Sequence, residues 1–283
     1  MSIEFKTKGS YSYYIVPKSE IEKIDFSLCK QPTETLENFY KRQTTKPALL
    51  FNGGFFNMKD GKTIFSYRDE NEVISTSYHK EGFGINKNTG ALEYGVADNT
   101  IFKDFISGYP VFIADKKPVT TNTGSEINYR AKRTILAYDN ENVYVIFSSG
   151  SYFSEAKAFL LDLGVTYAIN LDGGGSSRCV YNGKTSINAS AYSRPVDNVI
   201  SIYTKKIIYR VQVGAFRNKL NAEALREKIV VLPDAISAGY KSAYIREIDG
   251  LYKVQVGAFG KKENAEKVLN DLKSKGYNAF IAK

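Results

Sequence analysis

The sequence Val165-Thr-Tyr-Ala-Ile-Asn-Leu-Asp-Gly-Gly-Gly-Ser-Ser177 runs from an apolar segment into a carboxylate, three glycines and two hydroxyls. The apolar run from Val165 to Leu171 is typical of a buried strand, and Asp172 follows it directly. Three consecutive glycines cost chain entropy, but they let backbone N–H groups approach a ligand closely, and clustered N–H donors suit an oxyanion or a phosphate. The stretch therefore indicates either a site for a charged or polar ligand or a tight glycine-rich loop without such a role.

The residues before this stretch predict how it is presented. Ser154–Leu163 has the pattern of a helix, with Ser154 as its N-cap and Gly164 just after its last residue. This helix leads straight into the strand that ends before Asp172. We therefore expect Asp172 at the end of a strand, where rigid scaffolds often present functional groups.

A similar arrangement occurs earlier in the chain. A short apolar run, residues 48–51, precedes Asn52-Gly-Gly-Phe-Phe-Asn57. The carboxamides of Asn52 and Asn57 can orient a sugar or a phosphate through hydrogen bonds, whereas Asn-Gly is also a strong signal for a hairpin turn. Strand-like runs alternate with turns through residues 59–147, so we expect one large, mostly antiparallel sheet system.

Composition limits the classes of function. The 283 residues are 43% hydrophobic and 24% charged, which fits a globular protein of one large or two ordinary domains. Two cysteines, Cys29 and Cys179, and one histidine, His79, exclude a disulfide framework, a cysteine cluster and a two-histidine metal site. The sequence leaves open a pairing of the two separated cysteines, but we expect buried free thiols, and a structural or surface place for His79 rather than a catalytic one.

The N-terminal residues carry no sign of a leader. Met1–Ser10 lacks the apolar core of a signal peptide, and no apolar run in the sequence is long enough for a membrane helix. We therefore expect synthesis in the cytoplasm without a classical export signal, and no membrane span. This leaves open where the protein acts.

Charge divides the chain into two parts. Residues 1–204 contain 23 Lys and Arg against 22 Asp and Glu, whereas residues 205–283 contain 16 against 8. Such an asymmetry marks a boundary between a first domain, residues 1–204, and a basic second domain, residues 205–283. The basic domain is suited to an anionic polymer.

The basic part contains an internal repeat. Tyr209-Arg-Val-Gln-Val-Gly-Ala-Phe216 recurs 43 positions later as Tyr252-Lys-Val-Gln-Val-Gly-Ala-Phe259. Each copy is followed by a helical pattern and a short strand, which gives the β-α-β-β-α-β order of a small ferredoxin-like domain. An RNA-binding sheet would carry exposed aromatic residues within its central strands, and these strands read Val-Gln-Val, so no nucleic-acid partner is expected.

The doubled Val-Gln-Val-Gly-Ala-Phe motif resembles the sporulation-related repeat (SPOR) domain. The resemblance covers about residues 207–283. It implies binding to bacterial peptidoglycan, particularly to glycan strands stripped of their peptides. The excess of positive charge fits an acidic wall polymer as the partner.

Residues from about 40 to 204 resemble the phosphodiester glycosidase family, whose activity is the removal of N-acetylglucosamine from a sugar-1-phosphodiester. The resemblance is carried by five segments in order: Asn52–Phe56, Arg133-Thr134, Leu163-Gly164, Asn170–Ser177 and Arg194–Asn198. It implies a mixed α/β fold. The chain departs from the family at Leu136-Ala137, where the family often has a glycine.

The resemblance implies roles for single residues. Asp172 becomes the carboxylate at the anomeric carbon, as a base toward water or as an electrostatic stabiliser. Arg133 and Arg194 become phosphate clamps, because guanidinium groups pair bidentately with phosphate oxygens, and Asn52 and Asn57 orient sugar hydroxyls. Backbone, carboxamide and hydroxyl groups complete the substrate-binding set at Gly53, Gly54, Asn170, Gly173, Gly174, Gly175 and Ser176.

The remaining expectations concern partners. Glu81 and Glu126 are candidates for a second carboxylate. No cofactor and no metal are expected, although a divalent cation at Asp172 stays open because no second ligand can be named. The sequence thus predicts a glycosidase that acts on bacterial wall glycan or a sugar-1-phosphodiester, anchored to peptidoglycan in the manner of a phage or bacterial lysin and acting at the cell wall if released or exported. The alternative is a non-catalytic protein that binds the wall or a sugar phosphate.

Overall fold

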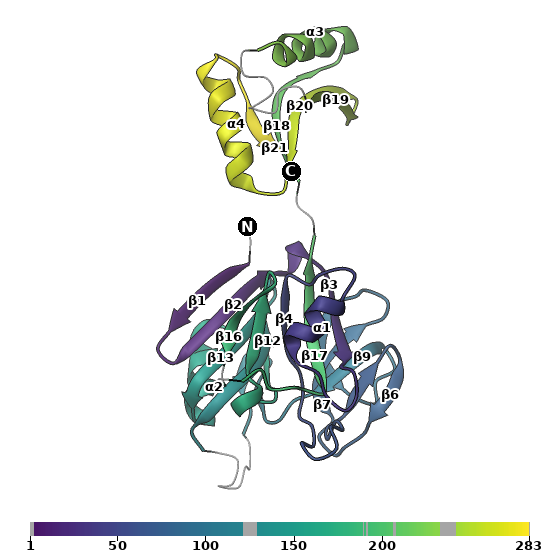
Figure 1. Ribbon diagram of the computed structural model, residues 1–283, viewed down its shortest axis with the longest axis vertical. Coiled ribbons are helices and arrows are strands. Elements are labelled where there is room, and N and C mark those ends of the chain that lie inside the picture. Colours follow the sequence, from purple (N-terminus) through teal and green to yellow (C-terminus); the bar gives the residue numbers. More distant parts are fainter. Residues whose placement is uncertain are drawn as a thin grey trace. The chain divides into compact units, whose positions relative to one another are not determined.

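The computed structural model describes residues 3–120, 129–188, 190, 192–205, 208–232 and 242–282. The chain divides into two compact units, Met1–Lys205 and Lys206–Lys283 (Figure 1). Each unit has its own hydrophobic core, so the two are described separately.

The first unit contains a seven-stranded antiparallel sheet. In spatial order its strands are β1 (Glu4–Lys8), β2 (Tyr11–Pro17), β13 (Asn142–Ser151), β12 (Ala131–Tyr138), β14 (Tyr167–Asn170), β10 (Val111–Ala114) and β11 (Lys117–Pro118). Helix α2 (Phe153–Leu163) packs Phe153, Phe159 and Leu160 against one face of this sheet, where they meet Ile135 of β12. The strand that precedes Asp172, β14, lies between β12 and β10 and is therefore an interior strand of the sheet.

Two five-stranded sheets complete the first unit. One has the order β16 (Lys184–Asn188), β15 (Arg178–Tyr181), β4 (Leu49–Asn52), β17 (Asn198–Thr204) and β3 (Ile21–Leu28). The other has the order β6 (Glu72–Ser75), β5 (Tyr67–Asp69), β9 (Phe102–Ser107), β7 (Glu81–Asn86) and β8 (Leu92–Val96). A short helix, α1 (Leu36–Arg42), and two 3-10 turns, η1 (Lys18–Glu20) and η2 (Gly174–Ser176), lie between strands.

The three sheets share one core. Side chains from all three meet in it, among them Tyr14, Phe51, Phe83 and Leu136. The predicted antiparallel pairing is confirmed for every ladder of the described residues, but the expected single sheet is wrong. A twisted sheet of this many strands splits into smaller packed sheets, because each strand has an apolar face to bury.

The helix before the Asp172 stretch agrees with its prediction except at its start. Its last residue is Leu163, and Gly164 adopts the left-handed conformation at φ 77° that closes a helix. At its beginning the Glu155 carboxylate accepts a hydrogen bond from the backbone N–H of Tyr152 at 3.0 Å. The helix therefore begins at Phe153, and Ser154 lies in its first turn instead of capping it.

The second unit has the element order read from the repeat. It comprises β18 (Tyr209–Phe216), α3 (Lys219–Val230), β19 (Ala243–Ile248), β20 (Leu251–Phe259), α4 (Lys262–Ser274) and β21 (Phe280–Ala282). The sheet order is β19-β20-β18-β21, so the two repeated motifs pair as its central strands. Equivalent residues of the repeats face each other: Gln255 Nε2 donates to Gln212 Oε1 at 3.3 Å.

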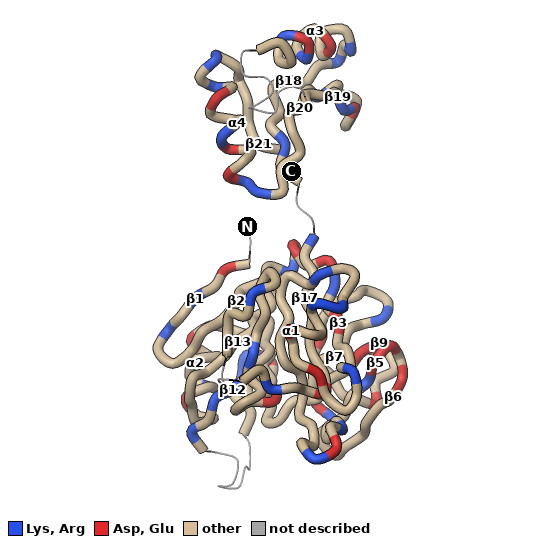
Figure 2. Tube along the Cα trace, in the orientation of Figure 1, with Lys and Arg blue, Asp and Glu red and all other residues tan. Residues whose placement is uncertain are grey.

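Charge in the second unit is not gathered on one element. Figure 2 shows basic and acidic residues interspersed along α3 and α4. The two helices carry little net charge, since α3 has three basic and two acidic residues and α4 has three of each, so most of the positive excess of this unit lies outside them. No described helix is long and apolar enough to cross a membrane.

Candidate active site

The two glycine-rich segments meet at Asp172. The backbone N–H of Asp172 donates to the carbonyl of Gly53 at 3.2 Å. The side chain of Asn52 donates to the carbonyl of Asp172 at 2.7 Å, across 120 positions of sequence. Leu171 is tied in turn to β12, because its N–H donates to the carbonyl of Thr134 at 2.8 Å. The strand ends of β4 and β14 thus deliver both segments to one place.

Asn52 holds this junction together. It is fully buried, and its Oδ1 accepts from the N–H of Arg178 at 3.1 Å and lies 3.1 Å from Thr134 Oγ1. With Nδ2 on the carbonyl of Asp172, each polar atom of the side chain has a protein partner. Asn52 is therefore a positioning residue, and the structure does not support the expected contact between its carboxamide and a sugar.

Gly53 and Gly54 are required for close packing rather than for ligand binding. The N–H of Gly53 donates to the carbonyl of Asn198 at 3.0 Å, and the N–H of Gly54 donates to Asn198 Oδ1 at 2.7 Å. A Cβ atom on Gly53 would lie 2.0 Å from Asn198 Oδ1. Both amides are already used, so the structure leaves neither of them for a substrate.

The triple glycine leaves two amides free. The N–H of Gly173 donates to Asp172 Oδ1 at 2.9 Å. Gly174 has a φ of +56°, which glycine adopts without cost, and a Cβ on Gly175 would lie 2.8 Å from Arg194 Nη1. Within the described residues the amides of Gly174 and Gly175 have no hydrogen-bond acceptor. These two amides are the donors that the loop can offer to an anion.

One buried side-chain oxygen near the loop, Asn170 Oδ1, lacks a partner among the described residues. Asn170 is held by its other amide atom, which donates to the carbonyl of Tyr109 at 2.8 Å. A buried polar atom without a partner is costly, so Asn170 Oδ1 is suited to a hydrogen bond with a bound ligand. The buried Ser176 hydroxyl acts instead on the Asp172 carboxyl group.

The structure separates the two arginines that were expected to act together. Arg194 lies beside Gly175, close enough to Asp172 to affect its ionisation, and its guanidinium also contacts Met58 Sδ. Arg133 is buried and extends toward α2. Its guanidinium donates to the carbonyl of Tyr129 at 2.5 Å and lies 4.4 Å from the ring centroid of Phe153.

Strand geometry explains the separation. Thr134 faces Asn52, so its neighbour on β12, Arg133, points to the opposite face of the sheet. A clamp formed by Arg133 and Arg194 around one phosphate is therefore not supported, and Arg194 alone lies at Asp172.

The segment that carries Arg194 is anchored by residues that the sequence did not single out. Glu37 on α1 accepts hydrogen bonds from Ser193 Oγ at 2.5 Å and from Arg178 Nε at 2.7 Å. Burial opposes ionisation of Glu37, but these bonds and one from Thr185 outweigh it and hold the pKa of Glu37 at about 2. Glu37 is therefore ionised at neutral pH and fixes the residue next to Arg194.

The other candidates lie elsewhere. Asn57 is exposed, and its Oδ1 accepts from the N–H of Lys59 at 2.9 Å within a turn. Glu81 begins β7 and accepts from the hydroxyl of Tyr94 at 2.5 Å. Glu126 lies outside the described residues.

The environment of Asp172 raises its pKa. Burial raises the pKa of this carboxyl to about 6, against the opposing effects of the Ser176 hydroxyl, the Arg194 guanidinium and the N–H of Gly173. A carboxylate with a pKa near neutrality is a better proton acceptor than an ordinary aspartate. The geometry and this pKa together favour Asp172 as a general base.

The raised pKa of Asp172 predicts that this residue destabilises the folded protein at alkaline pH, although it serves the reaction. Because the pKa in the folded state exceeds the unfolded value, stabilisation from Asp172 is present below pH 3.8 and is lost as the pH rises through about 6. Asp172→Asn should therefore increase the free energy of unfolding at pH 8 by on the order of 1–3 kcal/mol, with a much smaller effect at pH 4. Urea denaturation of both proteins at the two pH values measures this, and a variant less stable than the natural chain at pH 8 would contradict it.

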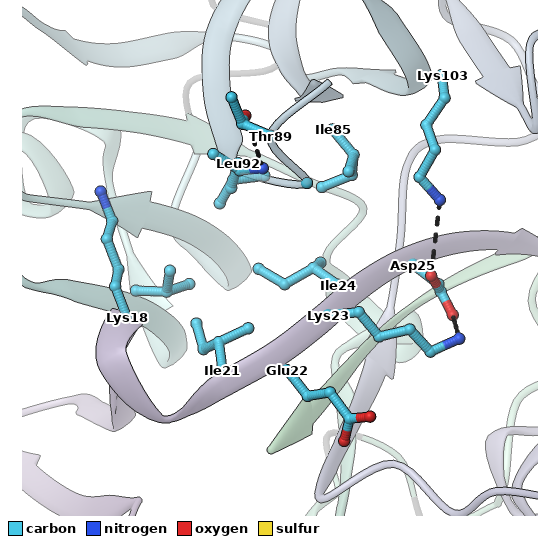
Figure 3. Close-up of a pocket in the computed structure, with 13 residues that line it drawn as sticks. Lys18, Ile21, Glu22, Lys23, Ile24, Asp25, Ile85, Thr89, Leu92 and Lys103 are labelled. Atoms are coloured by element: carbon cyan, nitrogen blue, oxygen red, sulfur yellow. Dashed lines mark hydrogen bonds and ion pairs between the residues drawn. The ribbon is translucent and has the colours of Figure 1, made fainter. Parts of the chain in front are cut away.

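Other features of the first unit lie apart from Asp172. A cavity of about 320 Å³ lies between β3 and the β7–β8 hairpin. Figure 3 shows Lys23 and Lys103 pointing to Asp25 beside it, and their Nζ atoms lie 2.6 and 3.9 Å from the Asp25 carboxylate oxygens. None of the site residues discussed above lines this cavity. In the part of the chain that the structure describes, no group of three His, Cys, Asp or Glu side chains is placed to hold a metal.

Comparison with known proteins agrees with this architecture. The family model of the phosphodiester glycosidases matches residues 45–203, and that of the SPOR domain matches residues 205–283. N-acetylglucosamine-1-phosphodiester alpha-N-acetylglucosaminidase of Mus musculus is 30% identical over 47% of this chain and 31% of its own length, and the Homo sapiens protein is 31% identical over the same shares. The chain thus spans about a third of the length of these curated relatives.

Solved structures show the same fold at lower identity. The zebrafish N-acetylglucosamine-1-phosphodiester alpha-N-acetylglucosaminidase catalytic domain, auto-inhibited by its pro-peptide, aligns with a TM-score of 0.57 and 22% identity over 72% of this chain and 82% of that one. A hypothetical protein from Synechocystis aligns with a TM-score of 0.60 and 14% identity over 72% of this chain and 61% of that one. With residues 45–203 matched over more than half of its length, the chain belongs to the phosphodiester glycosidase family and continues into a C-terminal SPOR domain.

Proposed function

We propose that the first unit hydrolyses the bond between the anomeric carbon of a sugar and the oxygen of a phosphodiester. The observation that carries the proposal is the placement of Asp172, with a pKa raised to about 6, beside Arg194 and the free amides of Gly174 and Gly175. Family membership supports it, since the curated relatives are named for action on an N-acetylglucosamine-1-phosphodiester.

Asp172, Arg194 and the two glycine amides each have a separate role in the proposed reaction. Arg194 and the two glycine amides bind the phosphate oxygens and stabilise the negative charge that grows on the leaving oxygen. The C1–O bond breaks, and its electron pair leaves with the phosphate monoester. Water attacks C1 and gives its proton to ionised Asp172, which also stabilises the oxocarbenium-like transition state.

The leaving group explains why one carboxylate is sufficient. An ordinary glycoside needs a general acid, because a sugar hydroxyl leaves poorly as an anion. A phosphate monoester is a far better leaving group and needs little protonation. Among the described residues the site around Asp172 has one carboxylate and one arginine, which suits a phosphodiester better than the glycosidic bonds of ordinary peptidoglycan.

Arg194 provides the specific test of phosphate recognition. Arg194→Ala should lower kcat/KM for an N-acetylglucosamine-1-phosphodiester by about 10²- to 10³-fold, because it removes a cation that binds the phosphate most tightly in the transition state. Arg194→Lys should recover only part of this loss, because lysine lacks the bidentate geometry.

Arg130→Ala is the matched control, since Arg130 is exposed and pairs with Glu155 at 2.7 Å. Steady-state kinetics at pH 7 compares the three variants. An Arg194→Ala enzyme with natural kcat/KM would remove Arg194 from the phosphate site.

We further propose that the second unit is a ferredoxin-like SPOR module that holds the enzyme on peptidoglycan or another anionic wall glycan of a bacterium. The family match and the charge of residues 205–283, with 16 basic against 8 acidic residues, support this partner. An enzyme held there would act at the cell wall after release or export, in the manner of a bacterial or phage lysin.

Sedimentation with purified cell walls tests the anchor. The full chain should pellet with the walls at 50 mM salt and be released progressively as salt is raised, because charge attraction is screened. A chain that ends at Lys205 should stay in the supernatant. Equal pelleting of the two proteins would contradict the anchoring role.

A further inference from the structure

A continuous row of aromatic rings lies next to the Asp172 site. It runs from Phe55 through Phe65 and His79 to Tyr109, with ring centroids 4.8, 4.7 and 4.1 Å apart in turn. Tyr78 adds a fifth ring at 4.1 Å from His79. These five residues are called the aromatic row below, and the chemistry proposed above uses none of their side chains.

Both ends of the aromatic row are fixed to the segments that carry Asp172. At one end, Phe55 directly follows the Gly53-Gly54 pair, and the carbonyl of Gly53 accepts from the N–H of Asp172 at 3.2 Å. At the other end, the backbone of Tyr109 exchanges hydrogen bonds with Asn170. Its N–H donates to the Asn170 carbonyl at 2.9 Å, and its carbonyl accepts from Asn170 Nδ2 at 2.8 Å. The row therefore borders the site through the backbone segments that carry Phe55 and Tyr109.

The aromatic row is not part of a hydrophobic core. Tyr78 is 88% exposed, and none of the five residues belongs to the core clusters of the described chain. Tyr78, His79 and Tyr109 instead line a cavity of about 330 Å³ together with Lys80 and Glu81. A concave surface that combines aromatic faces with a few polar groups is the usual form of a small-ligand site.

The chemistry of this cavity selects its ligand. Aromatic faces carry partial negative charge and attract the C–H groups on the apolar face of a pyranose ring. The Glu81 carboxylate and the Lys80 ammonium group can accept from and donate to the hydroxyls at the edge of such a ring. Burial lowers the pKa of His79, so its imidazole is neutral at pH 7 and offers one donor and one acceptor. Together these groups suit an uncharged sugar.

We infer that the cavity-lining part of the aromatic row, Tyr78, His79 and Tyr109, forms a sugar-binding subsite for a neutral pyranose unit of the substrate, next to but separate from the sugar whose C1–O bond is cleaved. The position of this subsite in the reaction rests on the function proposed above. The subsite implies that the natural substrate carries more than one sugar, and that compounds with a single sugar bind less tightly.

His79 gives a direct way to observe the subsite. It is the only histidine in the chain, so ¹³C-labelled histidine gives a single imidazole Cε1–H signal in the NMR spectrum of the full-length protein. This signal reports on the first unit alone, even if a sugar also binds the second unit. The probe is a tetrasaccharide of N-acetylglucosamine, titrated at pH 7 into the natural chain and into Asp172→Asn.

The subsite predicts a saturable shift of the His79 signal in both proteins. Tyr78→Ala should raise the apparent Kd at least about fivefold, since stacking on an aromatic ring is worth about 1 kcal/mol or more. Because Tyr78 is exposed, its replacement should not disturb folding, so a raised Kd would report the loss of a ligand contact. Tyr152→Ala is the control, because Tyr152 is an exposed tyrosine of the same unit outside the row, and its Kd should equal that of the natural chain.

Two results would overturn the subsite: a His79 signal that does not move at saturating tetrasaccharide, or equal Kd values for Tyr78→Ala and the natural chain. The proposed hydrolysis is measured separately on an N-acetylglucosamine-1-phosphodiester. A shifted signal without hydrolysis contradicts the proposed function and leaves the subsite in place. Hydrolysis without a shift contradicts the subsite alone.

Discussion

Asp172→Asn is expected to lower kcat for release of N-acetylglucosamine from an N-acetylglucosamine-1-phosphodiester by at least about 10³-fold. The substitution keeps the size of the side chain but removes both the negative charge near the oxocarbenium-like transition state and the acceptor for the proton of water. Because the loss falls on charge developed in the transition state, kcat should fall while substrate affinity changes little. Discontinuous assays of free N-acetylglucosamine at pH 7.5 measure this loss.

Asp162→Asn is the matched control for this experiment. Asp162 is an exposed aspartate that pairs with Lys8 at 2.5 Å, and its replacement should leave kcat unchanged. Substrate binding to Asp172→Asn, measured by calorimetry, distinguishes an enzyme from a non-catalytic binding protein. Retained binding with lost turnover supports the enzyme, whereas natural turnover in Asp172→Asn would remove this residue from the chemistry.

Asn52→Ala is expected to destabilise the first unit by about 3–5 kcal/mol. It leaves the carbonyl of Asp172 and the N–H of Arg178 without these hydrogen bonds, whereas the hydroxyl of Thr134 keeps Ser177 as its partner. An unsatisfied buried polar group costs about 1–3 kcal/mol, and the vacated volume adds to this. Activity should fall as well, because the carbonyl of Asp172 loses the bond that fixes its position.

Asn57→Ala is the comparison for this variant, since Asn57 carries the other carboxamide of the same segment but is exposed. Its replacement should cost less than about 1 kcal/mol, because only a turn contact to Lys59 is lost. Urea denaturation monitored by tyrosine fluorescence, which suits a chain without tryptophan, compares the two variants. Equal destabilisation would show that Asn52 does not hold the junction.

Local pattern predicted the parts of the fold that local interactions determine. The apolar run before Asp172 proved to be the interior strand β14, and Gly164 closes the helix that precedes it. The doubled motif at Tyr209–Phe216 and Tyr252–Phe259 corresponds to β18 and β20. Each of these features follows from a periodicity or a turn residue within a few positions of sequence.

The parts that could not be predicted depend on contacts between distant segments. The bond from Asn52 to the carbonyl of Asp172 spans 120 positions, and no local pattern distinguishes a carboxamide that fixes a loop from one that binds a sugar. The pKa of Asp172 likewise depends on burial by several segments. The division of the strands into three sheets depends on how the whole core closes.

The separation of the two arginines combines a local rule with a distant contact. Arg133 and Thr134 are adjacent in a strand, so their side chains must point to opposite faces of the sheet. Thr134 faces Asn52 and Ser177, so Arg133 has to face away from them. The alternation can be read from the sequence, but the face that meets Asn52 depends on a contact across 82 positions.

The proposed mechanism requires water to attack the sugar carbon and not the phosphorus atom. The decisive measurement is hydrolysis of an N-acetylglucosamine-1-phosphodiester in H₂¹⁸O, followed by mass spectrometry of both products. Attack at carbon places ¹⁸O at C1 of the released N-acetylglucosamine and none in the phosphate monoester, and Asp172→Asn should form both products at least about 10³-fold more slowly. Incorporation of ¹⁸O into the phosphate, or intact substrate after prolonged incubation with the natural chain, would rule out the mechanism.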